Sequence, residues 1–155
     1  MSIVIKVHFF LSRINKTYLI LIIVAFNLIS SVFTSFISKA VSGKMMTENA
    51  VNFRSLMEEI FIGLLLAPLL ETFFIQYAII ESFKSRLSKV KSIIISASVF
   101  GLLHFYNPFY LVYGFLAGLS FGYIYLISKS AIKGLLYTFL THLLYNSIVF
   151  TLLHI

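Results

Sequence analysis

The stretch "TYLILIIVAFNLISSVFTSFI", residues 17–37, runs for 21 residues without a charged side chain. A helix needs about 20 consecutive apolar residues to cross the hydrocarbon core of a bilayer. The whole chain has this character, because 60% of its 155 residues are hydrophobic, only 11% are charged and none is Asp. A soluble domain of this size could not cover so much apolar surface with so few charged groups. The sequence therefore predicts an integral, multi-pass membrane protein, with the lipid bilayer as its expected partner.

Four further apolar runs follow the first. The five runs lie at about residues 17–37, 58–80, 92–107, 109–128 and 132–153. The third is short, which suits a helix buried in a bundle or a locally thinned bilayer. The first run follows basic residues, as a signal peptide would, but it is long and lacks a clean small-residue cleavage site, so we expect it to be retained. The predicted fold class is all-α, a polytopic transmembrane helix bundle of about five spans.

The basic side chains predict the orientation of this bundle. Lys and Arg number three before the first run, three in residues 38–57, four in 81–91, none at 107–108 and two around 129–133. Cytoplasmic loops carry an excess of Lys and Arg, so we expect a cytoplasmic N-terminus, with nine basic residues inside, three outside and the C-terminus outside. Because the net charge of +7 is distributed between apolar runs, it does not indicate a nucleic-acid partner.

The chain divides into two regions. Residues 1–57 are expected to form an N-terminal tail, the first transmembrane helix and a polar loop, and residues 58–155 a four-helix core. The absence of Cys excludes disulfides and thiol catalysis. Within the core, "GFLAGLSFG" places Gly114, Gly118 and Gly122 at four-residue steps. Small residues at this spacing predict close helix packing, and a helix–helix oligomer through these glycines is a further prediction.

Few ionisable side chains lie inside the apolar runs. Glu71 lies in the second run, His104 in the third and His142 in the fifth, where Asn146 follows four residues later. Ionisable groups are costly in hydrocarbon, so their presence there indicates a functional site by default. At a rise of about 1.5 Å per residue, all four side chains reach similar depths near the middle of the membrane. We therefore expect one shared polar cavity, although each side chain alone could also be a structural group that bonds two helices.

Pro68 lies three residues before Glu71. Proline has no N–H group, so we expect the carbonyl near Leu64 to lose its helical partner and the helix to kink or loosen. A kink at this position would admit water to the carboxyl group of Glu71.

Three stretches in order, "APLLETFFIQ" (67–76), "FGLLH" (100–104) and "HLLYN" (142–146), resemble the motifs of the CPBP family, the CAAX-processing and bacteriocin-processing intramembrane proteases. The family pattern is a Glu-Glu-x3-Arg helix, often opened by Ala-Pro, then Phe-x3-His, then His-x3-Asn or Asp. The resemblance covers about residues 58–150. It implies an intramembrane endopeptidase, expected in a bacterial cell membrane, that acts on a CAAX-like, leader-peptide or membrane-protein substrate.

The resemblance also implies roles for the four polar residues. Glu71, helped by His104, would take a proton from the attacking water. His142 and Asn146 would donate hydrogen bonds to the oxyanion that develops on the peptide carbonyl. No metal or other cofactor is expected in this mechanism.

The first motif departs from the family pattern at two positions. Thr72 stands where a second Glu is usual, and Gln76 stands where Arg is usual. These two residues are four apart, so a hydrogen bond between their side chains would be a neutral substitute for the usual ion pair.

Three alternatives to this mechanism stay open. A zinc site formed by Glu71, His104 and His142 is the alternative within the enzyme class, although the sequence lacks HExxH and Asn146 is a better oxyanion donor than metal ligand. Some members of the family are linked to bacteriocin self-immunity, so a non-catalytic protective membrane protein is the second. A carrier that uses Glu71 as a proton relay is the third.

Overall fold

The computed structural model describes residues 3–47 and 53–154, and every regular element in these two ranges is helical. The predicted all-α class is confirmed. The polar loop expected before residue 58 falls partly on residues 48–52, which lie outside the described ranges. The separate helices are α1 (Ile3–Arg13), α2 (Lys16–Ser42), α6 (Lys89–Leu102), α7 (Pro108–Leu126) and α8 (Ala131–His154).

One further helix runs without interruption from Leu56 to Phe83, but its hydrogen-bond pattern changes four times. Its segments are α3 (Leu56–Glu58), η1 (Glu59–Leu66), α4 (Ala67–Glu71), η2 (Thr72–Ala78) and α5 (Ile79–Phe83), where η1 and η2 are π-helical. A π-helix bonds each N–H to the carbonyl five residues earlier and occurs frequently at functional sites.

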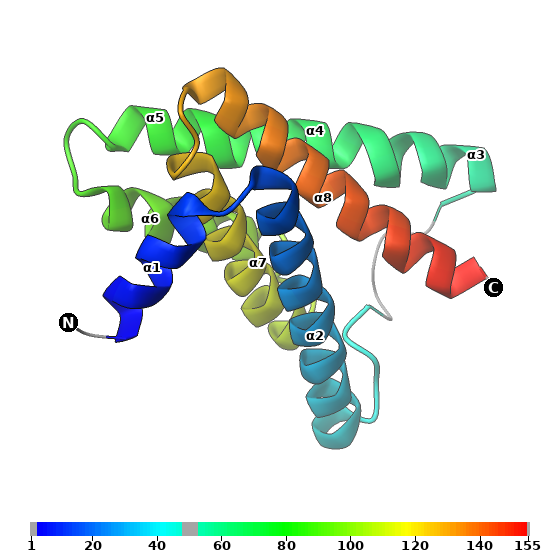
Figure 1. Ribbon diagram of the computed structural model, residues 1–155. Coiled ribbons are helices and arrows are strands. Elements are labelled where there is room, and N and C mark those ends of the chain that lie inside the picture. The colour runs from blue at the N-terminus through cyan, green and yellow to red at the C-terminus, as the bar shows by residue number, and fades with distance from the viewer. Residues whose placement is uncertain (1–2, 48–52, 155) are drawn as a thin grey trace.

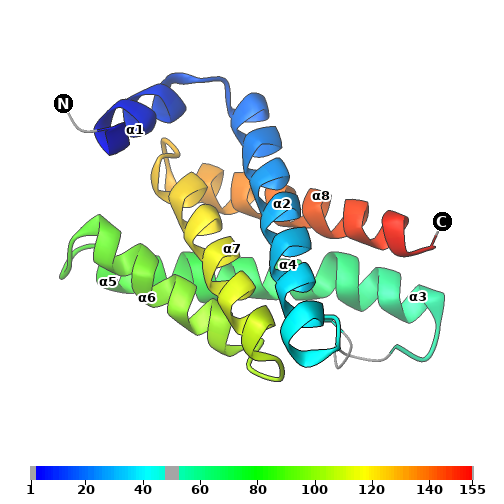
Figure 2. The same ribbon diagram turned by 90° about the horizontal axis from the view of Figure 1, so that it is seen from below.

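The helices form two crossing pairs. The Leu56–Phe83 helix and α8 lie side by side and run in opposite directions, while α2 and α7 lie side by side across them (Figures 1 and 2). Helix α6 packs along α7, and the two form a hairpin connected by residues 103–107. Asn107 ends this connection, because its side-chain oxygen accepts a 2.8 Å hydrogen bond from the N–H of Phe109 and caps α7.

Four of the described helices are long and apolar enough to cross a membrane: Lys16–Ser42, Leu56–Phe83, Pro108–Leu126 and Ala131–His154. The chain is therefore an integral, multi-pass membrane protein. About five spans were predicted, and the difference is α6, which has 14 residues and ends at Leu102. Residues 103–107, which were expected to continue this helix, form turns instead.

The distribution of polar and apolar side chains is the reverse of that in a soluble protein. Fully buried side chains include the polar Asn27, Gln76 and Thr141, whereas Phe33 and Phe36 are 62% and 70% exposed. Asn27 joins two helices, since its side-chain nitrogen donates a 2.9 Å hydrogen bond to the hydroxyl of Ser120 in α7. Polar groups that bond helices inside a bundle with an apolar exterior are typical of membrane proteins.

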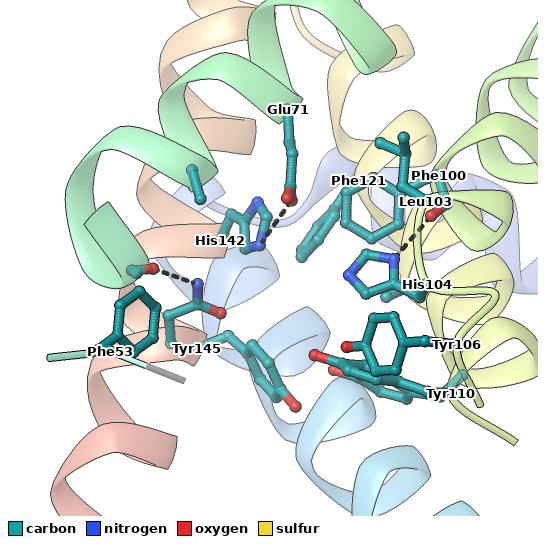
Figure 3. Close-up of a pocket in the computed structure, with 15 residues that line it drawn as sticks. Phe53, Glu71, Phe100, Leu103, His104, Tyr106, Tyr110, Phe121, His142 and Tyr145 are labelled. Atoms are coloured by element: carbon teal, nitrogen blue, oxygen red, sulfur yellow. Dashed lines mark hydrogen bonds and ion pairs between the residues drawn. The ribbon is translucent and has the colours of Figure 1, made fainter. Parts of the chain in front are cut away.

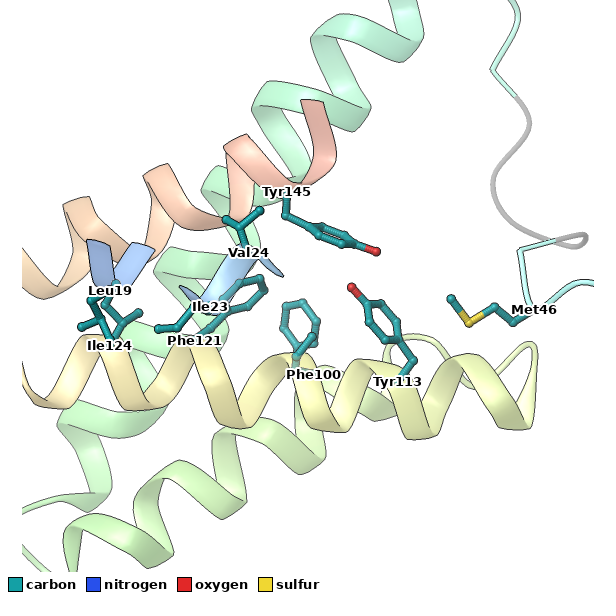
Figure 4. Close-up of a cluster of buried hydrophobic side chains, with 10 residues drawn as sticks. Leu19, Ile23, Val24, Met46, Phe100, Tyr113, Phe121, Ile124 and Tyr145 are labelled. Atoms are coloured by element: carbon teal, nitrogen blue, oxygen red, sulfur yellow. The ribbon is translucent and has the colours of Figure 1, made fainter. Parts of the chain in front are cut away.

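An apolar cluster fixes the crossing of α2 with α6, α7 and α8 (Figure 4). Its buried members are Leu19, Ile23, Val24, Met46, Phe100, Tyr113, Ala117, Phe121, Ile124 and Tyr145. Tyr113 and Tyr145 lie between Phe100 and Met46 in this view, and their hydroxyl groups point toward each other (Figure 4).

Glycines hold α6 against α7 in this hairpin. A Cβ atom added to Gly118 would lie 2.8 Å from the Cα atom of Ala97, and one added to Gly114 would lie 3.2 Å from the Cα atom of Gly101. The close helix packing predicted from the glycine steps is therefore present, within a single chain. An oligomer through Gly114, Gly118 and Gly122 stays a prediction, and a second copy would compete with α6 for this face.

Candidate active site

A cavity of about 280 Å³ lies between α8, the Leu56–Phe83 helix and the α6–α7 hairpin (Figure 3). Glu71, His104, His142 and Asn146 all line it. The structure thus brings together the four side chains that the sequence singled out from three separate apolar runs. The other lining residues are Phe53, Gly63, Ala67, Phe100, Leu103, Tyr106, Tyr110, Tyr113, Ala117, Phe121 and Tyr145.

Glu71 and His142 face each other across this cavity. The Oε2 atom of Glu71 lies 3.7 Å from the Nε2 atom of His142, and their side chains are 25% and 7% exposed. The imidazole of His142 is held in place by two phenylalanines, with ring centroids 4.7 Å from Phe121 and 5.7 Å from Phe100. Its Nδ1 atom is buried and has no hydrogen-bond partner among the described residues. Nε2 is therefore the nitrogen that His142 presents to the carboxyl group, at a separation slightly longer than a hydrogen bond.

His104 has one nitrogen committed to the backbone. Its Nδ1 atom lies 2.8 Å from the carbonyl oxygen of Phe100. A carbonyl oxygen only accepts, so Nδ1 must carry a proton, and Nε2 of the neutral ring is left with a free lone pair. His104 belongs to the turn that follows α6, two residues after Leu102, and not to a helix as expected. Because α6 is short, its end delivers this imidazole directly to the cavity.

Asn146 is anchored to the opposite helix. Its Nδ2 atom donates a 3.1 Å hydrogen bond to the carbonyl oxygen of Gly63 in η1. In an α-helix, that carbonyl would accept from the N–H of Ala67, but this N–H donates to Ile62 instead. In a π-helix the carbonyl of Gly63 would accept a hydrogen bond from the N–H of residue 68, but this residue is Pro68, which has no N–H.

Pro68 was predicted to leave a carbonyl near Leu64 without its helical partner, and the structure shows such a carbonyl one residue earlier. The carbonyl that needs an external partner is that of Gly63, next to Leu64, and the side chain of Asn146 satisfies it. The chain stays helical through Pro68, since the hydrogen-bond pattern changes from π to α at this point. One of the two N–H groups of Asn146 is thereby committed, and one is left for other partners.

The predicted hydrogen bond between Thr72 and Gln76 is absent. Both side chains are buried, and neither lines the cavity. The Oε1 atom of Gln76 accepts a 3.0 Å hydrogen bond from Ser96 in α6, whereas Thr72 Oγ1 and Gln76 Nε2 have no partner among the described residues. Residues 72–78 form η2, so this segment does not have the α-helical geometry on which the prediction relied. Gln76, one of the two departures from the family motif, therefore lies where the long helix packs on α6.

Four tyrosines that were not among the site residues predicted from the sequence also line the cavity. The rings of Tyr110 and His104 lie 4.6 Å apart, and those of Tyr106 and Tyr110 lie 5.3 Å apart. The hydroxyl groups of Tyr106 and Tyr110 point toward Tyr145 across the cavity (Figure 3). Tyr113 also lines the cavity, and its hydroxyl points toward that of Tyr145 (Figure 4). Tyr110 and Tyr113 are three positions apart in one apolar run, and this spacing, typical of one helix face, was a sequence signal that could have identified them.

This arrangement supplies the groups needed for proton transfer and hydrogen bonding. A carboxyl group, two imidazoles, an amide and phenolic hydroxyls line one cavity. Among the residues that the structure describes, no three His, Cys, Asp or Glu side chains are placed to hold a metal ion. The zinc alternative with Glu71, His104 and His142 would require these side chains to move closer together, and it stays a prediction.

No curated protein and no solved structure matches the chain. A family model described as "Type II CAAX prenyl endopeptidase Rce1-like" matches residues 53–155. The match covers well over half of the chain and includes all four predicted site residues. It confirms the resemblance to CAAX-processing membrane proteases that the three motifs indicated. The chain therefore belongs to the Rce1-like family of type II CAAX prenyl endopeptidases.

Proposed function

We propose that this protein is an intramembrane endopeptidase in which Glu71 activates the attacking water. The observation that carries the proposal is the placement of one carboxyl group opposite two imidazoles in a single cavity. The carboxyl group belongs to Glu71, which lies in a helix that can span a membrane. Family membership supports a protease of the CAAX-processing type. The mechanism and the substrate are our inference.

In the proposed reaction, the carboxylate of Glu71 takes a proton from water while the water oxygen attacks the carbonyl carbon of the peptide bond. The lone pair on His104 Nε2 accepts a hydrogen bond from the same water and orients it. The negative charge that develops on the carbonyl oxygen receives hydrogen bonds from His142 Nε2–H and from the uncommitted N–H of Asn146. Glu71 then passes its proton to the leaving nitrogen, and the C–N bond breaks.

The substrate is proposed to enter as an extended segment with apolar side chains. Phe53, Leu103, Ala117 and Phe121 supply apolar lining beside the catalytic groups. A CAAX-like tail, a leader peptide or a segment of a membrane protein would each fit this lining. A prenylated CAAX peptide is the first substrate to test, because the description of the matching family names a CAAX prenyl endopeptidase.

The deciding experiment compares Glu71→Gln with Glu81→Gln. Both remove one carboxylate and keep size and hydrogen-bonding capacity, but Glu81 lies outside the active-site cavity. Purified protein in lipid vesicles would be tested on a farnesylated CAAX peptide with a fluorophore and a quencher. We expect cleavage by the wild type and by Glu81→Gln, and none by Glu71→Gln. Equal cleavage by all three would exclude Glu71 as the base, and loss of cleavage with a zinc chelator would favour the zinc alternative.

A non-catalytic immunity protein is the second candidate. It is favoured by Thr72 and Gln76, which replace the usual acidic and basic residues and do not line the cavity. Such a protein would protect cells from a bacteriocin by binding alone. It should tolerate Glu71→Gln, because replacing a carboxyl group in the membrane by a neutral amide lowers its desolvation cost. Protection by Glu71→Gln at wild-type membrane abundance would therefore support this second function.

A further inference from the structure

A second cavity, of about 400 Å³, lies where α5 and α7 end and where α6 and α8 begin. Three of the four helices that can span a membrane have an end here, at Phe83, Leu126 and Ala131. The cavity therefore lies at one surface of the membrane. It shares no lining residue with the active-site cavity.

Three lysines line this surface cavity: Lys84, Lys89 and Lys129. Glu81 is the only acidic residue among its described lining residues, and its Oε1 atom already accepts hydrogen bonds from Lys84 Nζ and from the hydroxyl of Tyr125. Lys89 and Lys129 have no acidic partner among the described residues. The cavity thus has an excess of positive charge that the protein itself does not neutralise.

Close packing and helix caps hold the ends of the helices that form this cavity. A Cβ atom on Gly134 would lie 2.8 Å from both the ring and the carbonyl oxygen of Tyr125, so the first turn of α8 rests directly on the end of α7. Ser130 and Ser88 cap the two helices that begin here, accepting hydrogen bonds from the N–H groups three residues later. The N-termini of α6 and α8 both lie at the cavity and add partial positive charge to that of the lysines.

An apolar groove of about 350 Å³ continues from this cationic cavity. The two share Lys89 and Leu126, and the groove is further lined by Val90, Ile93 and Ile127. Its outer wall is α1, which contributes His8 and Ser12. Helix α1 is attached at this position by a 3.1 Å hydrogen bond between His8 Nδ1 and the hydroxyl of Tyr123.

We propose that the cavity and the groove together bind a phospholipid with an anionic headgroup. The phosphate would lie between Lys89 and Lys129, and an acyl chain would follow Val90 and Ile93 beneath α1. Lysine ammonium groups and helix N-termini are both suited to phosphate. A soluble phosphate would use only the cationic half of the site, whereas a lipid uses both halves at the surface where phosphates are concentrated.

The test uses purified full-length protein in a neutral detergent and measures its thermal unfolding temperature. The probes are short-chain phosphatidylglycerol, phosphatidylcholine with the same chains, glycerol 3-phosphate and inorganic phosphate. We expect phosphatidylglycerol to raise the unfolding temperature strongly and the other three to have little effect. The double variant Lys89→Gln/Lys129→Gln should bind phosphatidylglycerol at least about tenfold more weakly. The matched control is Lys39→Gln/Lys44→Gln, which removes two lysines near the C-terminal end of α2. Neither lysine lines the cavity or the groove, so this variant should behave as the wild type.

A third variant tests the apolar half of the site. Val90→Asn should weaken the effect of phosphatidylglycerol while leaving the cationic cavity intact. The proposal is wrong if phosphatidylglycerol has no effect, or if both double variants lose the effect equally, which would indicate general attraction of charge. Equal stabilisation by inorganic phosphate and by the lipid would assign the site to a soluble phosphate instead.

Discussion

The amide nitrogen of Asn146 and the carbonyl oxygen of Gly63 form a 3.1 Å hydrogen bond between residues 83 positions apart. It joins α8 to the Leu56–Phe83 helix beside the candidate active site. The bond exists because η1 redirects the N–H of Ala67 and because Pro68 has no N–H to offer. The proline of the first motif and the asparagine of the third are thereby two parts of one structural unit.

A double-mutant cycle can detect this connection. Asn146→Ala alone leaves the carbonyl of Gly63 without a donor and should cost about 1–3 kcal/mol in unfolding free energy. Pro68→Ala supplies an N–H five residues after Gly63, so Asn146→Ala should cost less when it is added to Pro68→Ala. The measurement is unfolding in detergent micelles for the four proteins. Costs that add independently would show that the two residues do not share this carbonyl.

Tyr110→Phe tests whether the tyrosines contribute to the chemistry. The variant removes one hydroxyl next to His104 and keeps the ring that packs on the imidazole. We expect cleavage of the farnesylated peptide to fall about tenfold or more, with little change in KM or in the unfolding temperature. Tyr18→Phe is the control, because that side chain is 66% exposed. A loss of stability that accounts for the whole loss of activity would reduce Tyr110 to a packing residue.

Gly118→Ala tests the α6–α7 hairpin. The new methyl group would meet the backbone of Ala97, which cannot move as a flexible side chain could. We expect a loss of about 1–3 kcal/mol in unfolding free energy, together with a loss of cleavage as α6 carries His104 away from the cavity. Val112→Ala, an exposed position on the same helix, should be nearly neutral in both assays. An unchanged unfolding curve for Gly118→Ala would show that the two helices can separate at little cost.

The orientation of the bundle can be measured with reporter fusions. The structure places residues 84–85 beside residues 128–130 and α1 beside the start of α6, so these segments lie at one end of the molecule. The basic residues predict that this end is cytoplasmic. A reporter after Lys89 should therefore lie in the cytoplasm and one after Ile155 outside. Finding both on the same side would exclude the predicted topology.

Much of the fold was predictable because the bilayer restricts the choices. A run such as 17–37 can satisfy its backbone in hydrocarbon only as a helix, so length and hydropathy identified the four long helices. The site was predictable in the same way, since Glu71, His104 and His142 are rare ionisable residues at similar depths. Their convergence required no knowledge of how the helices cross.

The features that sequence reasoning missed depend on contacts between distant residues. Glu81 was not among the residues predicted to have a role, but it accepts a hydrogen bond from Tyr125, 44 positions later. The hydrogen-bond partner of Gln76 is Ser96 on α6. The four-residue spacing in the sequence had predicted Thr72 as the partner of Gln76. The switch between α and π bonding in Leu56–Phe83 leaves the same apolar pattern in the sequence. Each of these choices is decided by tertiary packing, which a local pattern does not contain.

The short α6 also constrains how the protein is made. A helix of 14 residues spans about 21 Å, well short of a hydrocarbon core of about 30 Å. Its start carries Lys89 and Lys91, which favour the membrane surface over the hydrocarbon core. Its partner surface on α7 is built from glycines and is synthesised later. We therefore expect α6 to remain at the translocon until α7 has been synthesised and to enter the bilayer together with α7. His104 would then reach its position only after most of the chain has left the ribosome.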